Sequence, residues 1–360
     1  MKNTVNANEF LSALTKAAKI SKGSQYVPIM EEVKMSFEND KCTLTSSNLE
    51  QWGTFSISAY GDSFTFILQN TVSIVKACKF FKGDLVLDYD KEKNTVQLSS
   101  NGKSCKVLCC DVKDYPEMPV PTAENTYHTN ADELFNRYGK IKYAISKEDS
   151  RPIHTGVCFN RNQMVALDGY RVAINSNDKL KVDSKFVVPQ GAMNLLDSFD
   201  KSDIEIEVSK THIVFKNSEV TIMSRLLEGE YLDYDLAIPK NNNEIYTVNV
   251  KQYVNELKYL KEFDDRNSKR PVKFDNGTLS LHNSNGEFKA HVDIKGNAKS
   301  VYGYNLHYMM DGLNQFKDSD NITMKAGEAL SPIILTDDKD NFALVLPVRL
   351  KDVDMDRNVA

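Results

Sequence analysis

The sequence predicts an α+β fold built from three copies of one unit, each with two helices packed on antiparallel sheets. Three observations support this prediction. The chain has 360 residues, which is more than one ordinary core holds. The same order of helices and strands recurs about every 120 residues, as expected for an internal repeat. Alternating runs on either side of turn residues are typical of hairpins.

The first helix of each copy follows an extended segment. These segments begin at Thr4, His128 and Tyr246, and in each a polar residue, often Asn, is placed to cap an amphipathic helix. The pattern predicts helices over 8–22, 131–147 and 250–262.

The second helix of each copy lies between two strands. Segments from Phe64, Lys185 and Ser300 read as a strand, a helix, an acidic or glycine-containing turn and an alternating strand. They predict helices over 70–82, 190–201 and 305–317. Hairpins are predicted over 33–47 and 212–225.

Two polar segments mark the domain boundaries. The proline-rich stretch 115–125 and the polar stretch 238–246 separate the copies. We therefore expect domains at 1–122, 123–243 and 244–350, followed by a polar tail at 351–360.

Composition favours a globular protein of the cytoplasm. The chain is 41% hydrophobic and 26% charged, and its net charge is −5. The N-terminal residues resemble no signal peptide, and no apolar stretch reaches the ~20 residues that span a bilayer. The six cysteines show no disulfide framework.

Positive charge is concentrated on the predicted helices. Their six segments carry fifteen Lys or Arg and eight Asp or Glu, so the rest of the chain is strongly acidic. On three helices the lysines fall away from the apolar stripe, at Lys16, Lys19, Lys76, Lys79, Lys251 and Lys258. One such helix is usually a solvated face. Repetition in related units indicates a shared cationic surface, which attracts phosphates without reading sequence.

No motif recommends an enzyme. The phosphate-binding, dinucleotide-binding, nucleophile-elbow and zinc-protease signatures are all missing from the sequence. The pairs Asp264-Asp265 and Asp337-Asp338 lie in polar, turn-like stretches. Cys105, Cys109 and Cys110 lie in a strand-like run without a nearby His, so we expect buried thiols and no metal or other cofactor.

Several separated motifs resemble one family, the DNA polymerase III beta subunits of bacteria, or sliding clamps. "VPIMEEVKMSFENDKCTLTSSNLE" and "VKDYPEMP" resemble the family's first domain. "SRPIHTGVCF", "VALDGYRVA" and "SRLLEGEYLDYDLAIP" resemble its second. "YNLHYMMDGL", "LSPIIL" and "LPVRL" resemble its third. The similarity covers nearly the whole chain and implies a head-to-tail homodimeric ring, with helices lining a central hole.

The resemblance implies a peptide-binding groove between the second and third domains, where replication partners insert a short segment. One wall follows the Asp168-Gly169 turn, and the far side lies near the end of the chain. The implied residues are Leu167, Gly169, Tyr170, Arg171, Val172, Leu232, Leu236, Ala237, Asn305, Tyr308, Leu344, Val345, Leu346, Pro347, Val348, Arg349 and Leu350.

The chain departs from the family at four of these or nearby positions. Tyr170 replaces a common His, Leu232 a Pro and Leu236 a basic residue, and His154 stands where an apolar residue is usual. These departures concern partner preference. The family chain commonly ends at the residue matching Leu350. The further ten residues are expected to be flexible, and their deletion should leave peptide binding unchanged or tighter.

The resemblance also implies DNA-facing and dimer-forming residues. Besides the six helix lysines, Arg137, Lys140 and Arg151 would face DNA, and Cys105, Val107 and Phe263 would join the two chains. The expected function is a non-catalytic processivity clamp that encircles duplex DNA and binds polymerase and clamp-loader subunits through short motifs. Two alternatives stay open: a mobile-element clamp paralogue that does not load on DNA, and an enzyme acting on carbohydrates or nucleotides.

Overall fold

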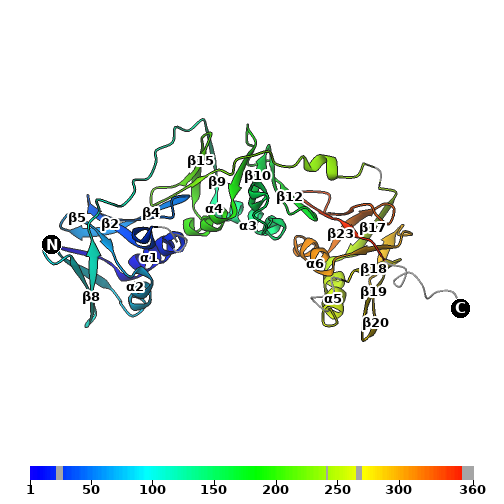
Figure 1. The fold of residues 1–360 in the computed structure, drawn as a ribbon, viewed down its shortest axis with the longest axis horizontal. Coiled ribbons are helices and arrows are strands. Elements are labelled where there is room, and N and C mark those ends of the chain that lie inside the picture. Colours follow the sequence, from blue (N-terminus) through cyan, green and yellow to red (C-terminus); the bar gives the residue numbers. More distant parts are fainter. Residues whose placement is uncertain (22–26, 241, 265–269, 351–360) are drawn as a thin grey trace. The chain divides into compact units, whose positions relative to one another are not determined.

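The computed structural model describes residues 1–21, 27–240, 242–264 and 270–350 (Figure 1). By their internal contacts these residues form two compact units. Unit 1 contains Met1–Phe135 and Gly191–Leu226, and unit 2 contains Asn136–Gln190 and the chain from Leu227 onward.

Unit 1 is built on one sheet of twelve strands. Its order is β1-β6-β7-β8-β5-β2-β3-β4-β16-β15-β14-β9. The strands are β1 (Lys2–Asn6), β2 (Val33–Glu38), β3 (Lys41–Ser47), β4 (Gln51–Gly61), β5 (Phe64–Leu68), β6 (Asp84–Asp90), β7 (Thr95–Ser100), β8 (Lys103–Cys110), β9 (Asn125–Asn130), β14 (Asp203–Val208), β15 (His212–Lys216) and β16 (Val220–Arg225).

A single strand joins the predicted first and second copies inside unit 1. β4 pairs antiparallel with β3 on one side and with β16 on the other, where Phe55 lies opposite Val220 and Trp52 opposite Met223. Trp52 and Met223 are buried together with Val214. The seam is therefore a continuous hydrogen-bonded sheet with its own apolar cover.

Unit 2 contains a nine-stranded and a five-stranded sheet. Their orders are β13-β10-β11-β12-β25-β24-β23-β17-β21 and β20-β19-β18-β22-β26. The strands are β10 (Gly156–Asn160), β11 (Gln163–Leu167), β12 (Arg171–Ser176), β13 (Phe186–Pro189), β17 (Glu244–Asn249), β18 (Val272–Asp275), β19 (Thr278–Asn283), β20 (Gly286–His291), β21 (Ile294–Gly296), β22 (Tyr302–Tyr304), β23 (Asn321–Ala326), β24 (Ile333–Thr336), β25 (Asn341–Val345) and β26 (Pro347–Val348).

A second seam lies inside unit 2. β12, from the predicted second copy, pairs antiparallel with β25, from the predicted third, with Val172 opposite Leu344. Because strands pair across both predicted boundaries, contacts divide the chain into two units. The three-domain boundaries stay a prediction based on the repeat.

The six predicted helices are confirmed. They are α1 (Ala7–Ser21), α2 (Thr71–Cys78), α3 (Ala131–Ile141), α4 (Gln190–Asn194), α5 (Val250–Lys261) and α6 (Leu306–Asn314). The fourth continues as the 3-10 turn η4 (Leu195–Phe199), and the third as η2 (Lys142–Ala144).

Asparagine caps explain where most of these helices begin. The side-chain oxygens of Asn6, Asn130, Asn249 and Asn305 each accept a hydrogen bond from a backbone N–H in the first turn of α1, α3, α5 and α6. α2 is capped differently, since the carboxylate of Glu32 accepts from the N–H groups of Asn70 and Thr71. The recurrence of one capping residue agrees with the predicted repeat.

Candidate functional site

The candidate site begins at the turn between β11 and β12. Gly169 has φ +86°, a left-handed conformation that suits glycine. The Asp168 carboxylate accepts hydrogen bonds from the N–H groups of Tyr170 and Arg171 at 3.0 and 3.1 Å. The Asp-Gly pair therefore fixes the turn and places the next two side chains.

The end of the chain lies directly beside this turn. Arg171 is paired with Val345 in the ladder between β12 and β25, and the Leu346 N–H donates to the Tyr170 carbonyl at 2.9 Å. The sequence interpretation placed the two segments on opposite sides of a groove. The structure corrects this, because they are neighbouring strands of one sheet.

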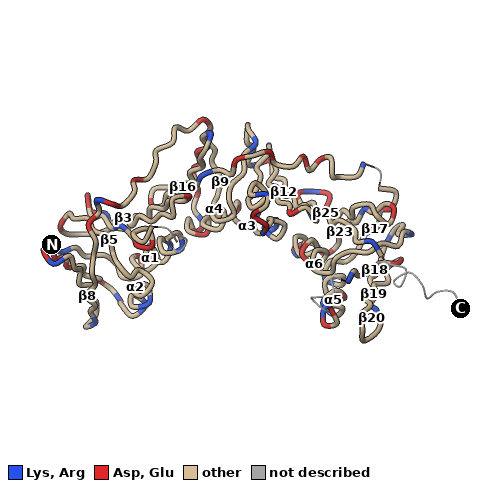
Figure 2. The backbone as a smooth tube through the Cα atoms, in the orientation of Figure 1, with Lys and Arg blue, Asp and Glu red and all other residues tan. Residues whose placement is uncertain are grey.

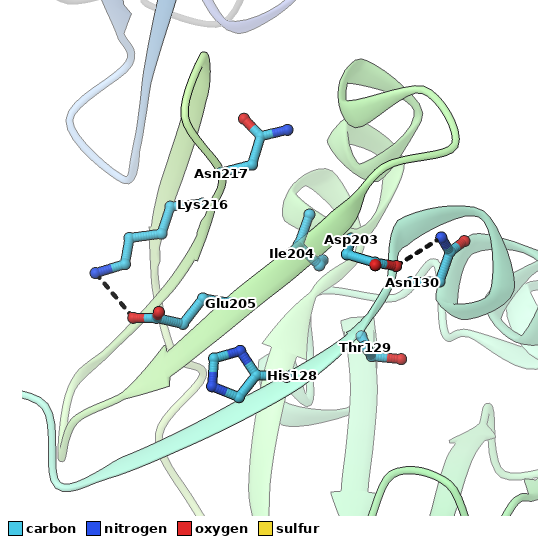
Figure 3. Close-up of a pocket in the computed structure, with 8 residues that line it drawn as sticks. All are labelled: His128, Thr129, Asn130, Asp203, Ile204, Glu205, Lys216 and Asn217. Carbon is cyan, nitrogen blue, oxygen red and sulfur yellow. Dashed lines mark hydrogen bonds and ion pairs between the residues drawn. The ribbon is translucent and has the colours of Figure 1, made fainter.

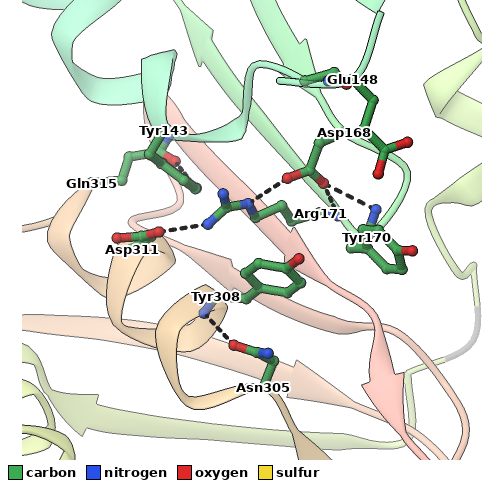
Figure 4. A network of polar contacts seen from close by, with 10 residues as sticks. Tyr143, Glu148, Asp168, Tyr170, Arg171, Asn305, Tyr308, Asp311 and Gln315 are labelled. Atoms are coloured by element: carbon green, nitrogen blue, oxygen red, sulfur yellow. Dashed lines mark hydrogen bonds and ion pairs between the residues drawn. The ribbon is translucent and has the colours of Figure 1, made fainter. Parts of the chain in front are cut away.

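Arg171 lies at the centre of a polar network (Figure 4). Its Nε donates to Asp168 at 2.9 Å and its Nη1 to Asp311 of α6 at 2.6 Å. The guanidinium carbon lies 4.4 Å from the ring centre of Tyr308 and 5.3 Å from that of Tyr143. Burial opposes the charge, but the two carboxylates outweigh it and raise the pKa of Arg171 above its ordinary value.

A second set of contacts joins the end of α6 to β12 of the nine-stranded sheet. The Tyr143 hydroxyl donates to Gln315 Oε1 at 3.0 Å, and Gln315 Nε2 donates to the Ile174 carbonyl at 2.9 Å. Burial raises the pKa of Tyr143, so its hydroxyl stays protonated. The network thus joins η2, β12 and α6.

The sequence did not reveal four members of this network. They are Asp168, as the ion-pair partner of Arg171, and Tyr143, Asp311 and Gln315. One signal could have found Asp311. It follows the predicted groove residue Tyr308 by three positions on a helix, so the two share a face. No local pattern points to Tyr143.

The aromatic part of the predicted groove is exposed. Tyr170 is 53% exposed and its ring centre lies 5.8 Å from that of Tyr308. Asn305, named for the same site, caps α6 and so positions the first turn that carries Tyr308. The structure brings these three residues together.

The predicted leucines lie in and just before the η5 turn (Tyr234–Ala237), with Leu236 inside it and Leu232 two residues ahead of it. Tyr231 and Tyr234 are buried in a cluster with Leu167, Val172 and Leu344. Leu232 and Leu236 stay outside it and are 44% and 83% exposed, while Ala237 is half-buried.

The last residues form the remaining part of the site. Leu344, Val345 and Leu350 are buried, whereas Leu346 and Arg349 are exposed. Val348 pairs with Gly303 of β22, as Pro347 does with Tyr304. A hollow of about 280 Å³ lies beside them, lined by Tyr302, Gly303, Ala329, Leu330, Val348, Arg349 and Leu350. The tail at 351–360 lies outside the described residues.

His154 is buried near the same cluster. Its ring meets Tyr231 edge to face, with centres 5.3 Å apart. Burial and the nearby Arg151 lower the pKa of His154. The imidazole therefore takes an apolar position in its neutral form.

The predicted DNA-facing residues differ in their surroundings. Lys16 and Lys19 of α1 form ion pairs with Asp200 at 3.1 Å and Asp197 at 2.7 Å. Lys76 and Lys79, at the end of α2, are exposed and have no ion pair among the described residues. Figure 2 shows Lys and Arg positions, in blue, at α2. Lys251 lies 3.7 Å from Asp320 with both side chains exposed, and Arg151 and Lys258 are exposed too, whereas Lys140 is half-buried.

The structure corrects the prediction that Arg137 faces DNA. Its side chain is buried and donates to Asn175 Oδ1 at 2.7 Å and to the Asn162 carbonyl at 3.2 Å. A guanidinium enclosed in this way supports β12 and does not face solvent. The family resemblance had implied that Arg137 faces DNA.

The predicted dimer residues lie at sheet edges. Residues 103–108 of β8 pair with β7, whereas β5 pairs with β8 only at Cys109 and Cys110. Cys105 and Val107 of this edge are half-buried. Phe263 stacks on Phe288 of β20, the edge strand of the five-stranded sheet, with ring centres 3.9 Å apart.

Unit 1 also contains a polar hollow of about 630 Å³ (Figure 3). Lys216 lies 3.0 Å from Glu205 and 2.8 Å from Glu207, and Asn130 donates to Asp203 at 3.0 Å. His128 stands opposite Glu205 on the neighbouring strand. Lys216 balances only one of the three carboxylates, so the hollow keeps a net negative charge. Among the described residues, no cluster of three or more His, Cys, Asp or Glu could hold a metal ion.

No helix in the described part of the chain is long and apolar enough to cross a membrane.

Comparisons with known proteins agree with the sequence resemblance. Residues 129–233 match the family described as DNA polymerase III beta subunit, central domain. A beta sliding clamp of Streptococcus pneumoniae serotype 4 is 26% identical and covers 96% of this chain and 98% of its own. A Staphylococcus aureus beta sliding clamp is 22% identical over 97% of this chain and 99% of its own.

Solved structures share the fold. The DNA polymerase sliding clamp from Bacillus subtilis matches with a TM-score of 0.88 at 20% identity, over 98% of this chain and 100% of that one. A DNA polymerase III beta subunit from Streptococcus pyogenes matches with a TM-score of 0.89, also at 20% identity, over 97% and 100%. The central part of the chain thus matches the DNA polymerase III beta subunit family, and over nearly its full length the chain is similar to the bacterial beta sliding clamps and shares their fold.

Proposed function

We propose that this protein is a sliding clamp: a non-catalytic processivity factor that closes as a homodimeric ring around duplex DNA and tethers replication proteins. The observation that carries the proposal is similarity over the full length. Relatives named beta sliding clamps align with 96–97% of this chain and with 98–99% of their own length. The cytoplasm is the proposed location.

The ring would close between sheet edges. Among the described residues, no strand pairs with the second edge of β8 at 103–107, and Leu108 beside it is 63% exposed. β20 is the edge of the five-stranded sheet. Unpaired edges invite pairing with another chain, and a head-to-tail contact repeated twice gives a closed two-fold ring. In this arrangement Cys105, Val107 and Phe263 would lie at the joint.

Duplex DNA would be held by charge and by enclosure. Lys76, Lys79 and Lys258 are exposed and free of ion pairs among the described residues, which suits contact with phosphates. Such contacts carry no sequence information and weaken with salt. Sequence-independent sliding needs no more than this.

Partners would bind at the surface formed by Tyr170, Tyr308, Leu232, Leu236 and Leu346. It combines exposed apolar and aromatic side chains with an ordered backbone, which suits a short extended segment. Polymerase and clamp-loader subunits are the proposed partners.

Retention on circular DNA tests the proposal. The protein is loaded onto nicked circular DNA and passed through a sizing column, with and without prior linearisation. A ring stays on the circle and is lost from the linear molecule. Equal loss from both would overturn enclosure, as would a monomer of 40.7 kDa by light scattering at micromolar concentration. A dimer that binds partner peptides but never loads would favour the mobile-element paralogue.

A further inference from the structure

Arg171 lies beneath the proposed peptide surface and is not available to a bound segment. Its side chain is 10% exposed and both ends of the guanidinium are engaged, by Asp168 and by Asp311. Two aromatic rings cover it, at 4.4 and 5.3 Å. The guanidinium therefore lies among carboxylates and aromatic rings, as the side chains in Figure 4 show.

Asp311 is the member of this arrangement that comes from outside the β12 turn. It lies one helical turn after Tyr308 on α6, so the ring and the carboxylate reach Arg171 from the same face of the helix. Its side chain is 43% exposed, and it makes the shorter of the two ion pairs. Asp168 cannot replace it, because that carboxylate also holds the turn through two backbone N–H groups.

The surface left to a partner is aromatic and electronegative. Tyr170 is 53% exposed beside Tyr308. Burial raises the pKa of the Tyr308 hydroxyl, the negative charge of Asp168 raises it further, and the positive charge of Arg171 lowers it. Because two carboxylates, Asp168 and Asp311, flank the single cation Arg171, the charge beneath the rings is net negative and disfavours an acidic side chain at the same place.

We propose that Asp311 is a positioning residue that keeps Arg171 away from the partner, so that this surface selects apolar and aromatic side chains and rejects acidic ones. The proposal rests on the peptide-binding role above. Without Asp311, the guanidinium keeps one carboxylate and has a free Nη1, which can reach a carboxylate of the bound segment.

A random decapeptide display library tests this. It is selected against the full-length protein, against Asp311→Ala and against Asp318→Ala, an exposed acidic residue beyond α6 that serves as the matched control. Peptides from the wild type and from Asp318→Ala should be poor in Asp and Glu. Those from Asp311→Ala should be enriched in them at least five-fold, and the enrichment should vanish in 0.5 M salt because charge pairs are screened.

The conservative variant Asp311→Asn separates positioning from folding. Its amide oxygen can still accept from Nη1, so its selected peptides should resemble those of the wild type. The same peptides from wild type and Asp311→Ala, with both proteins folded and dimeric, would overturn the inference. No enrichment on the wild type at all would instead overturn the peptide-binding role.

Discussion

At the scale of single residues, the main constraint on this protein is what surrounds each charge. Arg171 is buried with two carboxylates, and removing it leaves both without their partner. We expect Arg171→Ala to lower the free energy of unfolding by about 3 kcal/mol, the usual order for breaking a buried ion pair. Urea denaturation of the full-length protein measures this free energy. Arg151→Ala, an exposed arginine, should change stability by less than about 0.5 kcal/mol.

His154 gives the protein a stability that depends on pH. Its folded pKa lies below the ordinary value of 6.5, so the unfolded chain binds the proton more readily. Stability is therefore full above pH 6.5 and falls as pH drops through that value towards the folded pKa. Denaturation at pH 7.5, 6.0 and 5.0 should show this loss, and His154→Leu should reduce it. The same reduction in His128→Gln, a variant of an exposed histidine, would contradict the assignment.

At the scale of secondary-structure elements, tyrosine pairs connect α5 to the five-stranded sheet. The hydroxyls of Tyr253 and Tyr304 lie 2.9 Å apart and both rings are buried. Either single change to Phe leaves the other hydroxyl without its hydrogen-bond partner and should lower the free energy of unfolding by about 1–2 kcal/mol. The double change removes both groups and should cost less than the sum. A double-mutant cycle in urea reports this coupling, and simple additivity would disprove it.

The lysines of α1 are restrained by one acidic residue of η4 and by the acidic residue that directly follows η4. Lys16 forms an ion pair with Asp200 and Lys19 with Asp197, so the positive charge of both lysines is partly neutralised within unit 1. We expect the double variant Asp197→Asn, Asp200→Asn to bind duplex DNA about two- to five-fold more tightly at low salt, with a steeper salt dependence. Fluorescence anisotropy on a labelled duplex measures this. Asp203→Asn is the control on β14, and an equal gain there would point to net charge alone.

At the scale of the whole molecule, the spacing of apolar residues along the sequence predicted more of the structure than the positions of charged residues did. Six helices and two hairpins followed from apolar spacing and from asparagine caps, because these depend on neighbours in the chain. The surroundings of Arg137 and Arg171 did not follow. Both cations are enclosed by residues far away in sequence, such as Asn175 and Asp311, which only the fold brings together. The resemblance located Tyr170 and Tyr308, but not the network beneath them.

The seams formed by β4 with β16 and by β12 with β25 have a mechanical consequence. Rows of backbone hydrogen bonds join the predicted copies at both seams, so separating the copies by force must break a strand pair as well as straighten the connecting segments. Stretched by its ends in an optical trap, one chain should lengthen in two cooperative jumps, one for each unit. Evolution of such a molecule by exchanging single repeats would have to re-match a strand at every junction.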